Sequence, residues 1–312
     1  MRNSKIAIFG TIAALLASMA AAAAPDRGTA PVQVTVTVSG RNQQLVPRIT
    51  AANVLVYQDS RPRPVIDWTP VAESPNGVDL AILIDSSLGQ ALALQFPDIR
   101  SFIQELPAST HVGVAYAQYG SAKFTQQFTA DHNRAAAALW VPEGKIDAGG
   151  SIYQSVTDLA QHWPSDGRVR MALLVSDGVD LWRGVSDTDP MLNPDLGEAI
   201  HQAQTSGVTF YTIFAGSSVR FEHGPLLNLN GQGSLTRLAA ETGGEAYFQG
   251  TRTPIAFKPF LNEMLASLHQ EYLLTFQAQA GSESRSAALR VSTELPHVKI
   301  AGPSTVRVPA AH

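Results

Sequence analysis

Residues 78–89 read VDLAILIDSSLG, an apolar run that ends in an aspartate, two serines and a glycine. A strand that is covered by helices on both faces is hydrophobic at nearly every position, and residues 78–84 have this character and the length of a strand. The run therefore predicts a core strand of a parallel sheet. In open α/β sheets ligands bind at the carboxyl ends of the strands, which is where Asp85, Ser86 and Ser87 are expected to lie.

From residue 78 to about residue 269, strand-like segments alternate with segments of helical periodicity. This alternation is typical of βα units and predicts an α/β fold with a doubly wound, mainly parallel sheet. The further strands are expected at residues 111–118, 123–129 (an edge strand), 168–178 with its turn, and 207–216. The helices are expected at residues 92–106, 151–163, 233–248 (running into a short strand) and 254–269.

Segments of β character flank this region on both sides. Strand-like runs precede it at 32–40, 53–59 and 63–68, and others follow it at 271–279, 287–294 and 297–309. Because the termini of a chain often lie close together, we expect the two sets to form one small β-sandwich. The predicted divisions are a signal peptide at 1–23, a linker and β segment at 24–75, an α/β domain at 76–269 and a β segment at 270–312.

The first 23 residues have the pattern of a bacterial secretory signal peptide. Arg2 and Lys5 give a positive start, residues 6–16 are apolar, and the small residues that follow permit cleavage after Ala23. An uncleaved anchor is the alternative, but the apolar core is short for a membrane span, and no later stretch is long and apolar enough. We expect an exported protein, periplasmic or secreted, with no membrane span in the mature chain.

Composition and charge argue against several classes of function. The 312 residues are 45% hydrophobic and 15% charged, which is typical of a globular protein. Lys and Arg total 22 against 26 Asp and Glu, so nucleic acid is not an expected partner. The sequence contains no cysteine, which excludes disulfides, thiolate metal ligands and a cysteine nucleophile.

Three short motifs lie at the ends of expected core strands or at loop-to-helix turns: DSSLG at 85–89, AGGS at 148–151 and SDG at 176–178. Their order and spacing resemble the von Willebrand factor A domain. The neighbouring β segments resemble those of an exported bacterial subgroup of that family, first described from acidobacteria. The resemblance covers most of residues 32–309 and implies a Rossmann-like α/β fold.

In that family a metal-ion-dependent adhesion site combines an Asp-x-Ser-x-Ser loop after the first strand, a Thr at the start of a later helix and an Asp after the fourth strand. The resemblance implies Asp85 and Ser87 as loop ligands, Ser151 in the place of the threonine and Asp177 as the second carboxylate. Gly89 stands where the loop has its third hydroxyl. This glycine removes one direct or water-mediated contact to a metal.

Hard divalent cations such as Mg²⁺ prefer oxygen ligands and keep several waters, so hydroxyls and two carboxylates suit them. In the family the site lacks one ligand until a carboxylate of a partner completes it. The resemblance therefore implies a Mg²⁺ site, with Mn²⁺ or Ca²⁺ as alternatives, and a protein partner that offers an acidic side chain. The alternative is that Asp85 caps a turn and Asp177 fixes a loop, both common roles of aspartate.

A second group of acids follows the SDG motif. Asp180 and, within residues 186–198, Asp187, Asp189 and Asp195 lie near one another in sequence. A calcium loop also needs a glycine at its sharp turn and a closing bidentate Glu, and neither is well placed here. We expect a solvated loop followed by a helix.

No sequence motif favours an enzyme. Neither a G-x-S-x-G elbow nor an H-E-x-x-H pair is present, so we expect a non-catalytic binding module. One alternative is a metal-independent structural or assembly scaffold of the cell envelope, which the missing hydroxyl at Gly89 favours. A phosphohydrolase with Asp85 as nucleophile is the other alternative, although Ser87 stands where such enzymes have a second Asp.

Overall fold

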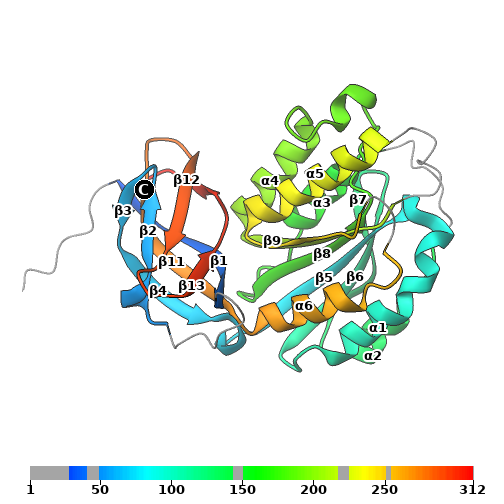
Figure 1. Cartoon of the computed structure of the whole chain (residues 1–312), viewed down its shortest axis with the longest axis horizontal. Coiled ribbons are helices and arrows are strands. Elements are labelled where there is room, and N and C mark those ends of the chain that lie inside the picture. The colour runs from blue at the N-terminus through cyan, green and yellow to red at the C-terminus, as the bar shows by residue number, and fades with distance from the viewer. Residues whose placement is uncertain (1–27, 41–48, 143–149, 217–224, 251–253, 312) are drawn as a thin grey trace, which may run out of the picture.

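The structure is a computed structural model that describes residues 28–40, 49–142, 150–216, 225–250 and 254–311. These residues form an α/β unit and a β-sandwich that lie side by side (Figure 1). The expected signal peptide lies outside the described residues, as does part of the AGGS motif. In the described part of the chain, no helix is both long and apolar enough to cross a membrane.

The α/β unit is built on a six-stranded sheet with the strand order β10-β9-β8-β5-β6-β7. Its strands are β5 (Val78–Asp85), β6 (Thr110–Gln118), β7 (Ser121–Thr129), β8 (Val169–Ser176), β9 (Val208–Phe214) and β10 (Ala246–Tyr247). Neighbouring strands are parallel except for β6 and β7, which pair antiparallel at one edge. This confirms the predicted doubly wound, mainly parallel sheet.

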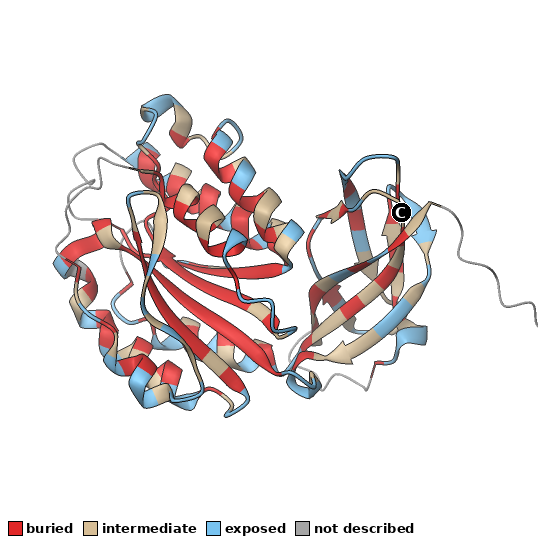
Figure 2. Cartoon of the chain, turned by 180° about the vertical axis from the view of Figure 1, so that it is seen from behind, coloured by how far each residue is buried: buried red, intermediate tan, exposed pale blue. Residues whose placement is uncertain are grey.

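Helices cover both faces of this sheet, so β5 is buried along its whole length (Figures 1 and 2). Alternate side chains of a strand point to opposite faces. Leu80, Ile82 and Ile84 join the core under α1, α2 and α6, and Ala81 and Leu83 join the core under α3, α4 and α5. The helices are α1 (Phe96–Glu105), α2 (His132–Ala137), α3 (Ile152–Gln161), α4 (Pro194–Ser206), α5 (Pro225–Thr242) and α6 (Lys258–Leu268).

The β-sandwich combines strands from both ends of the described chain. One sheet has the order β13-β1-β11-β4 and the other β14-β12-β2-β3, with all neighbouring strands antiparallel. The strands are β1 (Thr29–Gly40), β2 (Leu55–Gln58), β3 (Arg61–Arg63), β4 (Val65–Pro70), β11 (Glu271–Gln279), β12 (Arg285–Ser292), β13 (Val298–Ala301) and β14 (Thr305–Val308). One apolar core that includes Val36, Phe276 and Val308 joins the two sheets, so the predicted sandwich is confirmed.

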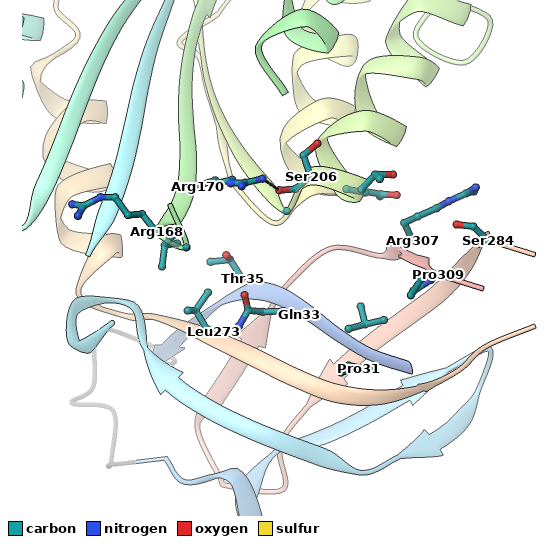
Figure 3. A pocket seen from close by; sticks show the side chains of 16 residues that line it. Pro31, Gln33, Thr35, Arg168, Arg170, Ser206, Leu273, Ser284, Arg307 and Pro309 are labelled. Carbon is teal, nitrogen blue, oxygen red and sulfur yellow. Dashed lines mark hydrogen bonds between the residues drawn. The ribbon is translucent and has the colours of Figure 1, made fainter. Parts of the chain in front are cut away.

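The sandwich packs against the side of the α/β unit where the parallel strands have their amino ends. A cleft of about 450 Å³ between the two parts is lined by Gln33 and Thr35 of β1, and by Arg170 and Ser206 of the α/β unit (Figure 3). Arg170 donates to the carbonyl of Ser206 at 2.8 Å and thereby joins the start of β8 to the end of α4. The carboxyl ends of the strands lie on the opposite side of the unit, away from the sandwich.

Glu271 opens β11 with a fully buried carboxyl group where the sandwich meets the α/β unit. The hydroxyl of Tyr211, on β9, donates to Glu271 Oε1, so this contact links the two parts. The second oxygen, Oε2, has no hydrogen-bond partner among the described residues. Burial raises the pKa of Glu271 to about 8, which makes the neutral acid its main form at pH 7.

We expect the Glu271→Gln variant to lose part of the pH dependence of folding stability. The pKa of about 8 in the folded state lies above the reference value of 4.5, so between these values the native state holds a proton that the unfolded chain has released. The free energy of unfolding therefore falls as pH rises through this window, by about 1.4 kcal/mol per pH unit from this group. Urea denaturation at several pH values measures the effect, and parallel pH profiles for wild type and variant would contradict it.

Candidate functional site

The four candidate ligands lie at the carboxyl edge of the sheet. Asp85 is the last residue of β5, Asp177 directly follows the neighbouring strand β8, Ser87 lies in the turn after β5, and Ser151 is the N-cap of α3. All four residues are buried, and the most accessible, Asp85, is only 6% exposed. The fold therefore brings oxygen-bearing residues from three segments of the chain to one edge of the sheet.

Asp85 connects the loops that follow β5 and β8. Its Oδ1 accepts the backbone N–H of Ser87 at 2.9 Å, and its Oδ2 accepts the hydroxyl of Ser176 at 2.7 Å. The Ser176 hydroxyl in turn accepts the N–H of Gly178 at 2.9 Å. Asp85 thus has the turn-capping role, but a carboxylate offers about four lone-pair sites, so both oxygens keep capacity for a cation.

Asp177 fixes the turn after β8. Its Oδ1 accepts the N–H of Val179 at 2.9 Å. Helix α5 closely approaches the same turn, because a Cβ atom on Gly231 would lie 2.0 Å from the carbonyl oxygen of Asp177. Only a glycine permits this approach, so α5 helps to hold Asp177 in place. The sequence pattern missed this first part of α5, since asparagines and glycines there have low helix propensity.

Asp180 is a further residue of the site, which the ligand assignment from the sequence missed. Its Oδ2 accepts the hydroxyl of Ser151 and the amide of Asn193, and its Oδ1 accepts the N–H of Trp182 at 2.9 Å. Ser151 Oγ also accepts the N–H of Tyr153 at 3.0 Å, which leaves one lone pair of this oxygen for a cation. No sequence signal connects Asp180 with Ser151, because only the fold brings the two together.

The buried Tyr153 lies within electrostatic reach of three of the acids. Its hydroxyl donates to the carbonyl of Gly178 at 2.7 Å. Burial raises the pKa of Tyr153 above its ordinary value, and the negative charges of Asp180, Asp177 and Asp85 raise it further. Three carboxylates within electrostatic reach of one buried hydroxyl give this edge a negative potential, which a divalent cation would reduce.

The donor set fits a hard cation that keeps some of its water. In the described ranges, no three acidic or histidine side chains form a metal-binding group, so a cation would need serine hydroxyls and water besides carboxylates. Mg²⁺ is commonly held in this way, by one or two carboxylates with several retained waters. Asp85 and Asp177 would supply the carboxylates, and Ser87 and Ser151 the hydroxyls.

The acids of residues 186–198 take local roles instead. Asp189 Oδ1 accepts the N–H of Met191 at 2.8 Å, and Asp187 accepts the hydroxyl of Ser186 at 3.0 Å. Asp195 accepts two hydrogen bonds from the guanidinium group of Arg183, each 3.1 Å long. Asp187 and Asp189 thus make contacts within the loop, and Asp195, in the first turn of α4, pairs with Arg183.

The backbone conformation at position 89 favours a glycine. Its φ of 64° and ψ of −151° put it in a region that is almost restricted to glycine. The residue kinks the 3₁₀ segment η4 (Ser86–Gln95) and directs the chain toward α1. The path of the chain after β5 therefore depends on the conformation of this glycine.

Comparison with known proteins gives only distant similarities. No protein-family profile and no curated protein sequence matches the chain. An aerotolerance-related membrane protein from Bacteroides fragilis is 14% identical with a TM-score of 0.43, covering 62% of this chain and 98% of that one. A human COPII-coat protein is 8% identical with a TM-score of 0.42, covering 76% of this chain and 44% of that one.

Proximal thread matrix protein 1 from the mussel byssus, in a structure with a zinc-occupied MIDAS motif, is 10% identical with a TM-score of 0.39. The match covers 63% of this chain and 46% of the mussel protein. This chain thus spans less than half the length of the human and mussel proteins. Similarities of this degree carry no site and no partner from those proteins to this chain.

We expect the Gly89→Ser variant to be less stable than wild type, although it introduces the hydroxyl that the resemblance implies at this position. An L-residue at this φ and ψ costs about 1–3 kcal/mol. The matched control is Gly197→Ala in α4, where a Cβ has no atom within 4 Å, and this change should be neutral or stabilising. Chemical denaturation measures both variants, and a Gly89→Ser protein as stable as wild type would show that the backbone does not require the glycine.

Proposed function

We propose that this protein is a non-catalytic, exported binding module of the von Willebrand factor A type. Asp85, Ser87, Ser151 and Asp177 would hold a divalent cation, Mg²⁺ or alternatively Mn²⁺ or Ca²⁺, and Asp180 would orient the hydroxyl of Ser151. When bound, the cation supplies a positive charge for an acidic side chain of a protein partner. The observation that supports this proposal is the gathering of buried oxygen-bearing side chains at the carboxyl edge of the sheet.

Export and the lack of catalysis belong to the proposal as well. Export, to the periplasm or the outside, rests on the sequence of residues 1–23. The non-catalytic assignment rests on the missing catalytic motifs and on the contacts of Asp85, the nucleophile in the phosphohydrolase alternative. Both oxygens of the Asp85 carboxylate accept hydrogen bonds that hold loops together. Nucleophilic attack by Asp85 would disturb this structural role.

A metal-independent scaffold is the second candidate, and one observation favours it. Asp85 and Asp177 already accept backbone N–H groups, so the loops have internal contacts without a cation. Binding of a partner that persists in excess EDTA would favour this candidate over the first.

We expect Mg²⁺ to bind the purified protein with a saturable heat and to raise its melting temperature, because ligand binding to the native state stabilises it. Asp177→Asn should weaken Mg²⁺ binding about tenfold or more, since it replaces a charged ligand by a neutral amide of the same shape. Isothermal titration calorimetry and thermal denaturation measure the two effects.

The matched control is Asp187→Asn, which removes a loop acid outside the site and should leave Mg²⁺ binding unchanged. A wild-type protein that gives neither heat nor a thermal shift with Mg²⁺, Mn²⁺ or Ca²⁺ would contradict the metal site. Equal loss of binding in both variants would indicate general electrostatics instead of ligation by Asp177.

A further inference from the structure

Helix α5, which covers one face of the sheet, presents an uncharged side to solvent (Figure 1). Leu226 and Leu229, at its start, are 65% and 55% exposed. Gly233, Thr236 and Ala240 continue the same side of the helix, because residues three, four and seven positions apart lie on one side. We call these five residues the outer strip of α5.

A groove of about 500 Å³ lies over the second half of the outer strip. Gly233, Thr236 and Ala240 line it, together with Met191 from the loop before α4 and Phe248 from the segment after β10. Met191 is 75% exposed and Phe248 is 44% exposed. The groove is therefore lined by small residues of the helix and by two large apolar side chains from other segments.

Contacts on both flanks of α5 hold this groove in shape. On one flank Pro190 packs against the helix, since a Cβ on Gly233 would lie 2.8 Å from its Cγ, and its carbonyl accepts the guanidinium group of Arg237 at 2.6 Å. On the other flank the amide of Gln232 donates to the carbonyl of Gly250. The groove is thus formed before anything binds to it.

The charges of the groove favour an apolar occupant. Among the described residues that line it, Arg237 and Glu241 are the charged ones, and they pair with each other at 2.8 Å. Covering the groove would therefore leave no unpaired charge without water, which is the main cost of burying polar surface.

The chain itself carries side chains that suit the groove. Leu226 and Leu229 lie on the same side of α5 as the groove, but at the opposite end of the helix. A two-fold axis near the middle of the helix brings the leucines of each copy to the groove of the other. Such self-complementary patches are typical of two-fold symmetric dimers, the commonest oligomers.

The area of this surface suits a reversible dimer. Leu226, Leu229, Met191 and Phe248 are large and exposed, and covering them would remove about 400 Å² of apolar surface from water in each copy, at roughly 100 Å² per side chain. The small residues and the walls of the groove add to this area. The sum approaches the roughly 600–800 Å² per partner of specific interfaces that form and dissociate.

We infer that two copies of this chain form a reversible, two-fold symmetric dimer in which Leu226 and Leu229 of each copy occupy the groove of the other. The dimer does not depend on the candidate cation site. Gly231, through which α5 approaches Asp177, is buried and lies on the side of the helix opposite to the outer strip.

Sedimentation velocity of the purified protein at several concentrations, with EDTA present to remove any cation-dependent association, tests the inference. We expect a dimer that dissociates on dilution. Leu229→Glu and Ala240→Glu should each weaken the dimer about tenfold or more, because each places a carboxylate in the apolar contact. Both residues are exposed in the single chain, so both variants should fold, which circular dichroism checks.

The matched control is Ile66→Glu, which changes a 52% exposed side chain on β4 of the sandwich and should leave the dimer unchanged. A protein that is monomeric at every concentration would overturn the inference, and this is the result if residues 217–224 or 251–253, which the structure does not describe, cover the outer strip. A dimer that survives both α5 variants would also overturn it.

Cross-linking tests the symmetry of the dimer, because the sequence contains no cysteine. A disulfide needs Cβ atoms about 4 Å apart. A tagged Leu229→Cys protein mixed with an untagged Ala240→Cys protein should therefore form a mixed disulfide on mild oxidation, faster than either variant cross-links alone. Equal or faster cross-linking within either variant alone would overturn the proposed arrangement.

Discussion

Strand β5 is buried on both faces and hydrogen-bonded to a neighbour on both edges, and this constraint determines where the chain can place polar side chains. A polar group inside such a strand would lose water without gaining a partner. Asp79, near its start, is the exception: its Oδ1 accepts the guanidinium group of Arg168 at 2.7 Å, while its Oδ2 is buried without a hydrogen-bond partner among the described residues. The remaining polar groups of this segment come at its carboxyl end, with Asp85 and the residues after it.

The same constraint explains why the candidate site is held together before any ligand binds. Asp85 reaches the loop after β8 through Ser176, and Asp180 reaches the start of α3 through Ser151. Turns from three segments therefore share carboxylate contacts, and each contact leaves oxygen lone pairs unused. Asp180 also accepts the backbone N–H of Trp182, which fixes the turn after β8.

Much of the fold follows from local sequence patterns. The apolar run of β5, the alternation of strands and helices and the flanking β segments predict the doubly wound sheet and the sandwich, because each pattern reports burial on one or two faces. The start of α5 could not be predicted, since its asparagines and glycines are selected by contacts such as that of Gly231 with Asp177. The dihedral angles of Gly89 are likewise visible only in the folded loop.

The candidate ligands were inferred from motifs, whereas the contacts around them depend on distant segments. Asp180 looked like one of several loop acids in the sequence, and its role comes from its contact with Ser151.

Crystals of the protein soaked with Mn²⁺ test the central claim most directly, because the anomalous scattering of manganese locates the ion. The account predicts one strong anomalous peak at the carboxyl edge of the sheet, with oxygens of Asp85, Ser87, Ser151 and Asp177 at about 2.0–2.6 Å or bridged to it by a single water. A fully soaked crystal with no peak at this edge, or with its strongest peak elsewhere on the molecule, would contradict the claim.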